Sequence, residues 1–217
     1  MSLKVLYEDN HLIAVHKPAG LLVQGDSTND RCLMDEVKDY IKEKYSKKGN
    51  VFLGLLHRLD RGVEGIVLFA KTSKGASRLS EQFRNHVVKK TYEALVEGVV
   101  KQAKGTLVNY LIKDENKNVV QVFDNNVPGS LRAELDYEKI KEIGDTTLLR
   151  INLKTGRPHQ IRSQLSHLGY PIVGDKKYGA KTIWKSGVIA LAAVKLEFRK
   201  AVGDDLVQLS IPNPFIQ

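Results

Sequence analysis

The stretch HRLDRGVEGIVLFA, residues 57–70, joins a charged turn to a short apolar run. Residues 65–70 are too few for a typical helix and rich in residues that favour β-structure, so we expect a buried strand there. The turn before it holds one carboxylate, Asp60, between Arg58 and Arg61. Two neighbouring guanidinium groups favour the ionised form of a carboxylate at neutral pH. The stretch therefore predicts a charged oxygen at the start of a buried strand, either in a structural ion pair or as a nucleophile.

Most of the chain around this strand has the pattern of further strands. Helices are expected at residues 33–45, where Asn29 or Asp30 could be the N-cap, at 159–168, and after Ser73 as a potential N-cap. Because most extended segments follow one another through hairpin-length turns, the sequence predicts an α+β (mixed α/β) fold with a largely antiparallel sheet. Strands are expected at residues 3–7, 12–15, 65–70, 91–96, 131–143, 146–153, 188–198 and 206–211.

Length and composition are those of an ordinary globular protein, with 217 residues, 42% hydrophobic and 27% charged. We expect one domain over residues 1–217 and a monomer. The single cysteine, Cys32, cannot form an internal disulfide, which gives no sign of an oxidising compartment. No apolar run is long enough to cross a bilayer, and the start MSLKVLYEDN does not read as a signal peptide. We expect a cytoplasmic protein that makes no membrane contact.

The formal net charge of +9 is concentrated in limited segments. Residues 151–200 contain ten Lys and Arg but only two acids, and residues 71–90 contain six Lys and Arg against Glu81. Clustered positive charge attracts a polyanion, most often a nucleic acid. Ordinary solvated lysines are the alternative explanation.

A second polar segment, TGRPHQIRSQLSHLGYPIVGD, covers residues 155–175. Arg157, His159 and Arg162 crowd the start of the helix predicted there, where free N–H groups favour anions. His159, Arg162 and Ser166 share the face opposite the apolar stripe, so they could face a cleft together or form a solvated surface. No His, Cys and carboxylate cluster has metal-ligand spacing, and no glycine-rich phosphate loop is present. We therefore expect neither a metal nor a nucleotide cofactor.

The two segments together resemble the signature motifs of RluA-type pseudouridine synthases. The resemblance extends, in the family's order, over roughly residues 3–212. The matching pieces are residues 9–20, 57–61 with 65–72, 90–98, and 155–162 with 167–175 and Tyr178-Gly179.

This resemblance implies an enzyme that isomerises uridine to pseudouridine in rRNA or tRNA without cofactor or metal. It places the catalytic aspartate at Asp60, the active-site tyrosine at Tyr92 and the basic partner of the aspartate at Arg162. It also implies a long central sheet, flanking helices and a central cleft that receives a flipped-out nucleotide. The residues expected to contact RNA are Arg58, Arg61, Arg157, His159 and Lys177.

Three roles for the Asp60 carboxylate stay open: attack on C1′, attack on C6 of uracil, or removal of a ribose proton. The chain also departs from the family pattern, because it starts close to the catalytic motifs, so we expect no N-terminal RNA-binding module. Glu64 and Ala192 stand where relatives carry a small hydroxyl residue and a histidine. The alternatives are a non-catalytic RNA-binding protein of the same fold and, less favoured, a hydrolase that uses Asp60 and His57.

Overall fold

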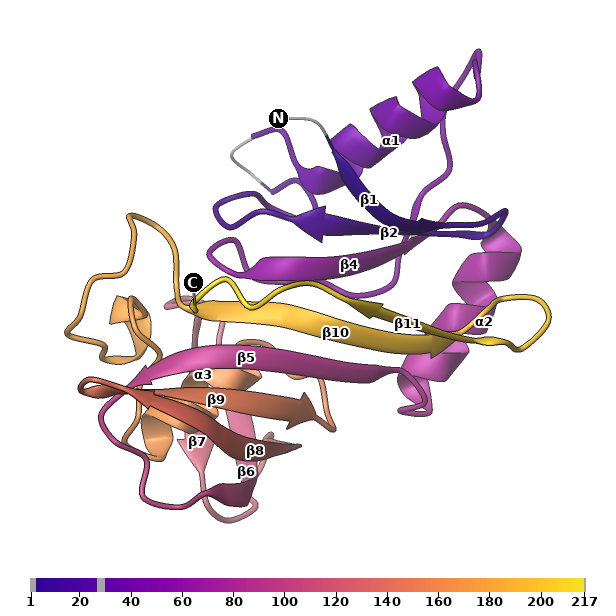
Figure 1. The fold of residues 1–217 in the computed structure, drawn as a ribbon. Helices are drawn as coiled ribbons and strands as arrows, with labels where there is room; N and C mark the ends of the chain where they lie inside the picture. The colour runs from indigo at the N-terminus through magenta and orange to yellow at the C-terminus, as the bar shows by residue number, and fades with distance from the viewer. Residues whose placement is uncertain (1–2, 27–29, 217) are drawn as a thin grey trace. The chain divides into compact units, whose positions relative to one another are not determined.

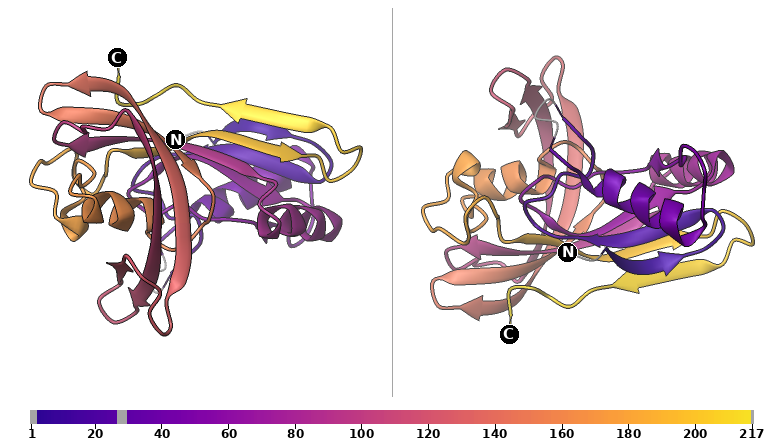
Figure 2. Two further views of the ribbon diagram at one scale, coloured as in Figure 1. Left: turned by 90° about the horizontal axis from the view of Figure 1, so that it is seen from below. Right: turned by 90° about the horizontal axis from the view of Figure 1, so that it is seen from above.

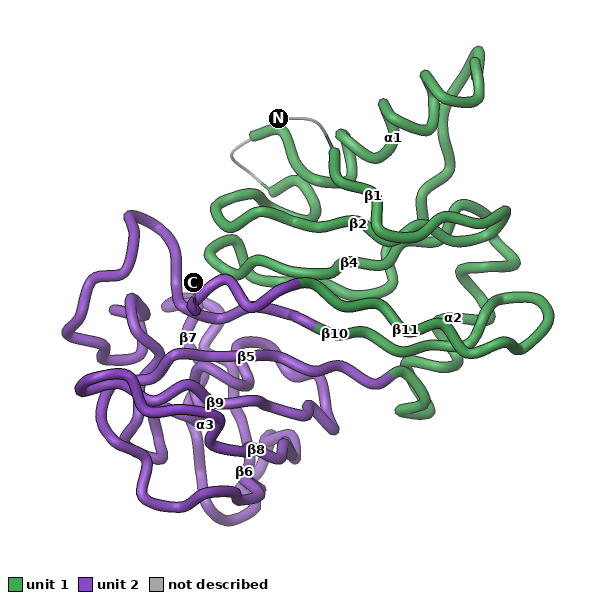
Figure 3. Tube along the Cα trace, in the orientation of Figure 1, with its two compact units in different colours: residues 1–88, 195–211 green, residues 89–194, 212–217 purple. Residues whose placement is uncertain are grey.

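The computed structural model describes residues 3–26 and 30–216, which contain eleven β-strands, three α-helices and one 3-10 helix (Figure 1). Contacts divide the chain into two compact units, which Figure 3 shows in different colours. Unit 1 comprises residues 1–88 and 195–211, and unit 2 comprises residues 89–194 and 212–217. None of the helices in the described ranges is both long and apolar enough to span a membrane.

In unit 1 the strand order is β1-β2-β4-β10, with β3 paired to β4 and β11 paired to β10. The β1–β2, β2–β4, β3–β4 and β10–β11 pairs are antiparallel. The core of the unit is built from strand residues and α2, represented by Leu12, Ile66, Leu68, Leu79 and Phe198. The strands are β1 (Lys4–Glu8), β2 (Leu12–Lys17), β3 (Gly54–Leu55), β4 (Glu64–Ala70), β10 (Leu191–Arg199, whose first four residues belong to unit 2) and β11 (Leu206–Ser210).

The helix α1 (Leu33–Lys44) lies where the sequence predicts it and buries Leu33, Val37 and Ile41. Its N-cap is Cys32, whose backbone N–H donates to the Asp35 carboxylate at 3.1 Å, so the expectation of Asp30 as the cap is wrong. The other proposed cap, Asn29, lies outside the described residues.

The helix α2 (Ser73–Arg84) begins directly after β4. Its N-cap is Thr72, whose hydroxyl accepts the N–H of Gly75 at 3.1 Å, so Ser73 is the first helical residue and not the predicted cap. Thr72 Oγ1 also lies 2.8 Å from His11 Nδ1 in the β1–β2 turn. These contacts fix the helix start against the edge of the unit 1 strands.

In unit 2 the strand order is β10-β5-β9-β8-β6-β7, and the pairs from β5 to β7 are antiparallel. Figure 2 shows β8 and β9 as a long curved hairpin, which turns at Gly144 with φ of 56°. The prediction of a mixed fold with a largely antiparallel sheet is confirmed. The elements are β5 (Lys89–Glu97), β6 (Lys104–Asp114), β7 (Val119–Phe123), β8 (Leu131–Ile143), β9 (Thr146–Leu153), α3 (Gln160–His167) and the 3-10 helix η1 (Lys176–Tyr178).

Candidate active site

The loop that carries Asp60 connects β3 to β4 in unit 1. Leu59 and Val63 are buried on either side of the partly exposed Asp60. The N–H of Val63 donates to the carbonyl of Asp60 at 3.0 Å and closes a turn. The loop is therefore held by packing and by its own backbone, which favours a fixed direction for the carboxylate.

A fully buried lysine, Lys17, fastens this loop to the end of β2. Its ammonium donates to the carbonyl of Pro18 at 3.0 Å and to the carbonyl of Arg61 at 3.1 Å. The N–H of Gly20 adds a 2.7 Å bond to the same Arg61 carbonyl. Burial lowers the pKa of Lys17 to about 8, against the opposing effect of the negative charges of Asp60 and Glu64. Unit 1 thus places a buried cation where it interacts with the charge of Asp60.

Lys17 is not among the site residues predicted from the sequence. The available signal was a lysine at the end of an otherwise apolar strand, immediately before Pro18. Glu64, one of the two departures from the family pattern, acts as a counter-charge: its negative charge raises the pKa of Lys17 and of His16 against the larger lowering by burial.

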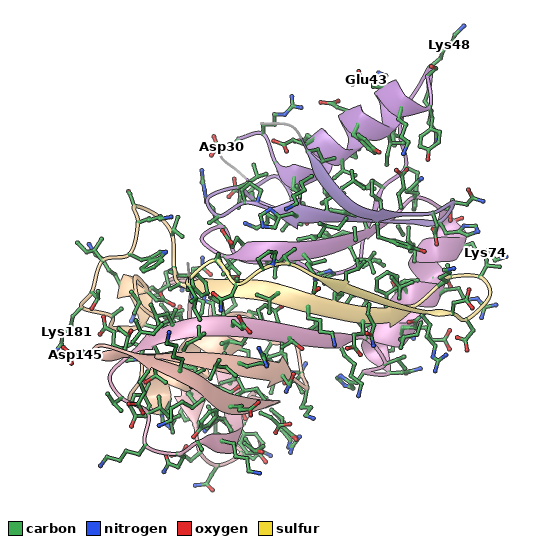
Figure 4. The ribbon with its side chains drawn as sticks, viewed as in Figure 1. Asp30, Glu43, Lys48, Lys74, Asp145 and Lys181 are labelled. Carbon is green, nitrogen blue, oxygen red and sulfur yellow. The ribbon has the colours of Figure 1, made fainter. Side chains whose placement is uncertain are left out.

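The two arginines beside Asp60 are exposed. The Arg61 side chain donates from Nε to the carbonyl of Gly20 at 3.1 Å and forms a 3.0 Å ion pair with Asp30. Asp30, labelled in Figure 4, lies in the loop that leads to α1. The RNA contacts expected of Arg58 and Arg61 stay predictions.

His57 is a structural histidine. Its Nε2 accepts the N–H of Leu68 at 3.0 Å, and its ring stacks on Phe83 with centroids 5.1 Å apart. A ring nitrogen that accepts an amide N–H has its lone pair occupied, so Nδ1 carries the proton of the neutral ring. This argues against the hydrolase alternative, which needs His57 as a base.

In unit 2 the guanidinium of Arg162, on α3, is held by Asp175. Nε and one terminal nitrogen donate to the two carboxylate oxygens at 2.7 and 2.9 Å, a bidentate geometry. Asp175 is 1% exposed and the Arg162 side chain 11%, so the pair is almost fully removed from water. The guanidinium also lies 5.0 Å from the ring centre of Tyr178, a cation–π contact. From the sequence, Asp175 is recognisable only as part of a motif, and its pairing with Arg162 was not predicted.

The polar side chains of α3 contact Tyr178, the last residue of η1. Its hydroxyl accepts the N–H of Val120 at 2.9 Å and lies 2.8 Å from His159 Nδ1. Its carbonyl accepts the hydroxyl of Ser166 at 2.6 Å. The prediction that His159, Arg162 and Ser166 share one face of the helix is confirmed, and that face packs against η1.

The turn before α3 is organised by a buried glutamine, Gln160. Its Oε1 accepts the N–H of Arg157 at 3.0 Å and the hydroxyl of Thr155 at 2.8 Å. Its Nε2 donates to the carbonyl of Glu134 on β8 at 3.1 Å. His159, next to it, has φ of 48°, the left-handed region that non-glycine residues rarely adopt. The position of His159 is therefore imposed by this network and not by helical preference.

Tyr92 belongs to the same unit and is 7% exposed on β5. The segment after α3 returns to this strand, because Val173 donates its N–H to the carbonyl of Leu95 at 2.9 Å. Tyr92 lies three residues from Leu95, about 10 Å along a strand. The fold thus brings the strand of Tyr92 close to the segment that holds Arg162.

Two further predicted RNA-binding residues have backbone partners. Lys177 donates to the carbonyl of Asn118 at 3.0 Å, and Arg157 donates to the carbonyl of Arg132 at 3.1 Å. The Lys177 side chain is nevertheless exposed. Within residues 3–26 and 30–216, no group of three or more His, Cys, Asp or Glu side chains is placed to hold a metal ion.

Comparison with known proteins gives consistent matches. The profile of the RNA pseudouridylate synthase family matches residues 11–167. "Ribosomal large subunit pseudouridine synthase C" of Buchnera aphidicola (subsp. Acyrthosiphon pisum) is 36% identical over 180 residues, 81% of this chain and 54% of that protein. "tRNA pseudouridine synthase C" of Vibrio cholerae is 34% identical over 191 residues, 82% of this chain and 74% of that protein. The chain spans about half the length of the Buchnera relative.

Among solved structures, "Human RNA Pseudouridylate Synthase Domain Containing 4" superimposes with a TM-score of 0.80 at 23% identity, covering 98% of this chain and 89% of that one. "Human RNA Pseudouridylate Synthase Domain Containing 1" gives a TM-score of 0.77 at 21% identity, covering 99% and 84%. At 23% and 21% sequence identity, the similarity to these two structures shows a shared fold and nothing more.

Proposed function

The chain belongs to the RNA pseudouridylate synthase family, and on this basis we propose that it isomerises uridine to pseudouridine in RNA. The observation that carries the proposal is the family match over residues 11–167, which includes Asp60, Tyr92 and Arg162. The proposed enzyme is a single catalytic domain that works without metal or cofactor.

Asp60 supplies the reactive carboxylate. The N1–C1′ bond breaks, uracil rotates, C5 bonds to C1′, and the proton on C5 leaves. The carboxylate assists by attack on C1′, by attack on C6 or by removal of a ribose proton, and each role requires an ionised, oriented oxygen. The Lys17 bonds to the carbonyls of Pro18 and Arg61 support this reading, because they tie the backbone next to Asp60 to the segment that follows β2.

Arg162 is the basic partner of Asp60 in this proposal. A guanidinium has five N–H donors, and Asp175 takes two of them in its bidentate contact. The role that the family resemblance assigns to this guanidinium is a charge-assisted interaction with the Asp60 carboxylate. Tyr92 offers a flat ring against which uracil stacks and a hydroxyl for the departing C5 proton.

The proposed substrate is a uridine in structured rRNA or tRNA. Because such a base is stacked, the nucleotide flips out, at a cost of about a few kcal/mol. The surrounding basic side chains then hold the RNA backbone without reading its sequence. The residues proposed for this contact are Arg58, Arg61, Arg157, His159 and Lys177.

The test is to map pseudouridines in total RNA from cells with and without the gene, and then to treat the unmodified RNA with the purified chain. The proposal predicts at least one site that is lost with the gene and restored by the protein. Identical maps, with RNA binding retained, would instead support the non-catalytic RNA-binding alternative.

A further inference from the structure

The last turn of α1 and the segment that follows it, residues 42–52, hold the two exposed aromatic side chains of the part of the chain that the structure describes. Tyr45, the C-cap of α1, is 47% exposed, and Phe52, two residues before β3, is 51% exposed. The other exposed large hydrophobic side chains in the described ranges are aliphatic. Single exposed apolar residues are common on protein surfaces, so these two rings gain their meaning from the charges around them.

Tyr45 is held in one position in spite of its exposure. Its hydroxyl donates to Oε1 of Glu8 on β1 at 2.8 Å. The ammonium group of Lys71 lies 4.7 Å from the centre of the Tyr45 ring, a cation–π contact. The end of α1 is therefore fixed against β1 and the start of α2.

The turn that ends α1 is closed by its own backbone. The N–H of Ser46 donates to the carbonyl of Glu43 at 3.2 Å, and the N–H of Lys47 donates to the carbonyl of Lys42 at 3.0 Å. Ser46 has φ of 48°, so the two bonds form the pattern of a helix that ends with one left-handed residue. This closure sets the direction in which the chain leaves the helix at Lys47.

The lysines of this segment outnumber its acids. Residues 42–52 contain four lysines and one acid, Glu43. Lys44 pairs with Glu8 at 2.6 Å, which offsets its charge. The other three are exposed and form no ion pair with any described residue, and they are Lys42, Lys47 and Lys48. Figure 4 labels Glu43 and Lys48 and shows the Lys48 side chain pointing away from the strands of unit 1.

Phe52 lies on β3, with part of its ring against the backbone and the rest open. A Cβ on Gly54 would lie 3.6 Å from Cε1 of Phe52. Gly54 pairs with Ala70, the last residue of β4, whereas Asp60 precedes the first residue of that strand. The length of β4, about 20 Å, therefore separates the Phe52 ring from the Asp60 loop.

An exposed ring beside unpaired lysines suits one kind of ligand in particular. Single-stranded nucleic acid binds through bases that stack on aromatic side chains and through phosphates that contact cations. Lysines in the last turn of a helix also stabilise the helix dipole, which is the ordinary explanation for Lys42. That explanation does not extend to Lys47, Lys48 and Phe52, which lie beyond the helix.

We propose that residues 42–52 bind a single-stranded part of the RNA substrate, with one base stacked on Phe52 and the backbone phosphates against Lys47 and Lys48. The inference rests on the proposed function for the identity of the ligand as RNA. Because the surface lies at the far end of β4 from Asp60, it contacts nucleotides other than the target uridine. It therefore adds affinity for the RNA that flanks the modified position.

The test measures affinity and needs no turnover. The probe is a fluorescein-labelled oligouridylate of about 12 nucleotides, long enough to include bases outside the catalytic site. Phe52→Ala is expected to weaken binding by about fivefold to a hundredfold, the size of one base–aromatic stack. Phe52→Trp should retain the affinity, and its added indole fluorescence should fall when RNA binds. Phe52→Leu keeps an apolar side chain but no flat ring, so it should lose most of the affinity that Phe52→Ala loses.

Matched variants separate stacking from general loss of surface or charge. Leu206→Ala removes an aliphatic side chain that is 56% exposed in the same unit, and it should bind as wild type. Lys47→Met and Lys48→Met should each reduce the slope of log affinity against log salt by about 0.7, the value for one phosphate of a single strand. Glu43→Gln removes the opposing charge from this surface and should tighten binding, which a purely structural role would not produce.

Two results would overturn the inference. The first is that Phe52→Ala binds the probe as tightly as wild type, even if pseudouridine forms, and the proposed function would then stand without this surface. The second is that Phe52→Leu and Phe52→Trp bind equally while the lysine variants weaken binding, because the surface would then attract a polyanion by charge alone. If the expected binding pattern is found but no pseudouridine forms on any RNA, the proposed function fails while the RNA-binding surface stands.

Discussion

Several charged side chains around the proposed site are buried, and each forms hydrogen bonds or ion pairs with defined partners. Lys17 is fully buried beneath the Asp60 loop, and Asp175 is buried beside Arg162. On β5, Glu93 is 5% exposed and accepts two bonds from Arg150 at 3.1 and 2.8 Å, with Asn213 on its other oxygen. Removing a charge from water is costly unless a partner compensates, so such groups are retained where a side chain must be held in one orientation.

The pH dependence of stability tests the state of Lys17. Burial lowers its pKa from 10.5 to about 8 in the folded state. Below pH 8 both states are protonated, and the cost of burying the charge is fully present. Between about pH 8 and 10.5 only the unfolded state holds the proton, so the free energy of unfolding should rise with pH, by up to about 3 kcal/mol from this group.

The measurement is denaturant unfolding of wild type and Lys17→Met from pH 7 to 10.5. The wild type should gain stability relative to the variant across the upper part of this range. Parallel curves would show that Lys17 does not titrate as described. At pH 7 the variant leaves the Pro18 carbonyl without its lysine donor, at a cost of about 1–3 kcal/mol where water cannot replace it, while the Arg61 carbonyl keeps the N–H of Gly20.

Asp175→Asn tests whether the bidentate pair positions Arg162. The amide offers one acceptor in place of two and removes the negative charge that holds the guanidinium in the bidentate contact. We expect a loss of about 3–5 kcal/mol in stability and a fall in kcat with little change in RNA affinity. Single-turnover pseudouridine formation and urea unfolding measure both.

The matched control is Asp136→Asn. Asp136 is 36% exposed and pairs with Lys154 at 2.9 Å, so its loss should cost less than about 1 kcal/mol. If Asp175→Asn behaves like this control, the pair does not hold Arg162 as proposed.

At the scale of elements, close packing at the start of α2 fixes β4 and the turn that precedes β2. A Cβ on Gly75 would lie 2.6 Å from the carbonyl oxygen of His11, which is too close for any real contact. This glycine therefore has a packing role, and the helix start sits directly on the β1–β2 turn. Lys74, labelled in Figure 4, lies beside it on the exposed side of the helix.

Gly75→Ala should destabilise the protein although alanine is the better helix former. The helix-propensity gain of about 1 kcal/mol opposes a backbone clash that neither neighbour relieves by a rotamer change, so we expect a net loss of about 1–3 kcal/mol. Ser77→Ala, at an exposed position in the same helix, should be neutral or slightly stabilising. Equal thermal midpoints for both variants would contradict the close contact at His11.

The elements that the sequence predicts well are those with strong local patterns. The two strands of the β8–β9 hairpin were predicted at residues 131–143 and 146–153, and α1 was predicted at residues 33–45. The N-caps were predicted less well. Thr72 and Ser73 are both residue types that favour the N-cap position, and Thr72 is distinguished by its contact with His11, which is distant in the sequence. Strands β6 and β7 were not predicted, since each alternates only weakly and depends on its partners.

For the site, local pattern singled out Asp60 and Arg162, whereas Tyr92 and the three catalytic roles come only from the resemblance, and these roles stay predictions. The supporting residues Lys17 and Asp175 were not predicted. The sequence does not show that Lys17 is buried, nor that Asp175 forms a bidentate pair with a residue 13 positions earlier. His57 could be interpreted in two ways until its bond to Leu68 was known.

At the scale of the whole molecule, the +9 charge should govern RNA affinity. Each phosphate contact releases counterions, so log affinity should fall linearly with log salt concentration. Lys177→Met should reduce the magnitude of this slope by about one if Lys177 contacts a phosphate. An affinity that is independent of salt would contradict the electrostatic account, and an unchanged slope would remove Lys177 from the contact surface.

The central claim is that the charged oxygen at position 60 carries out the isomerisation. The direct test compares the wild-type protein with Asp60→Asn on RNA from cells that lack the gene, and measures both pseudouridine formed and RNA bound. The account predicts that the variant binds RNA with nearly wild-type affinity but loses on the order of a thousandfold or more in rate. Pseudouridine formed by the variant at the wild-type rate would contradict it.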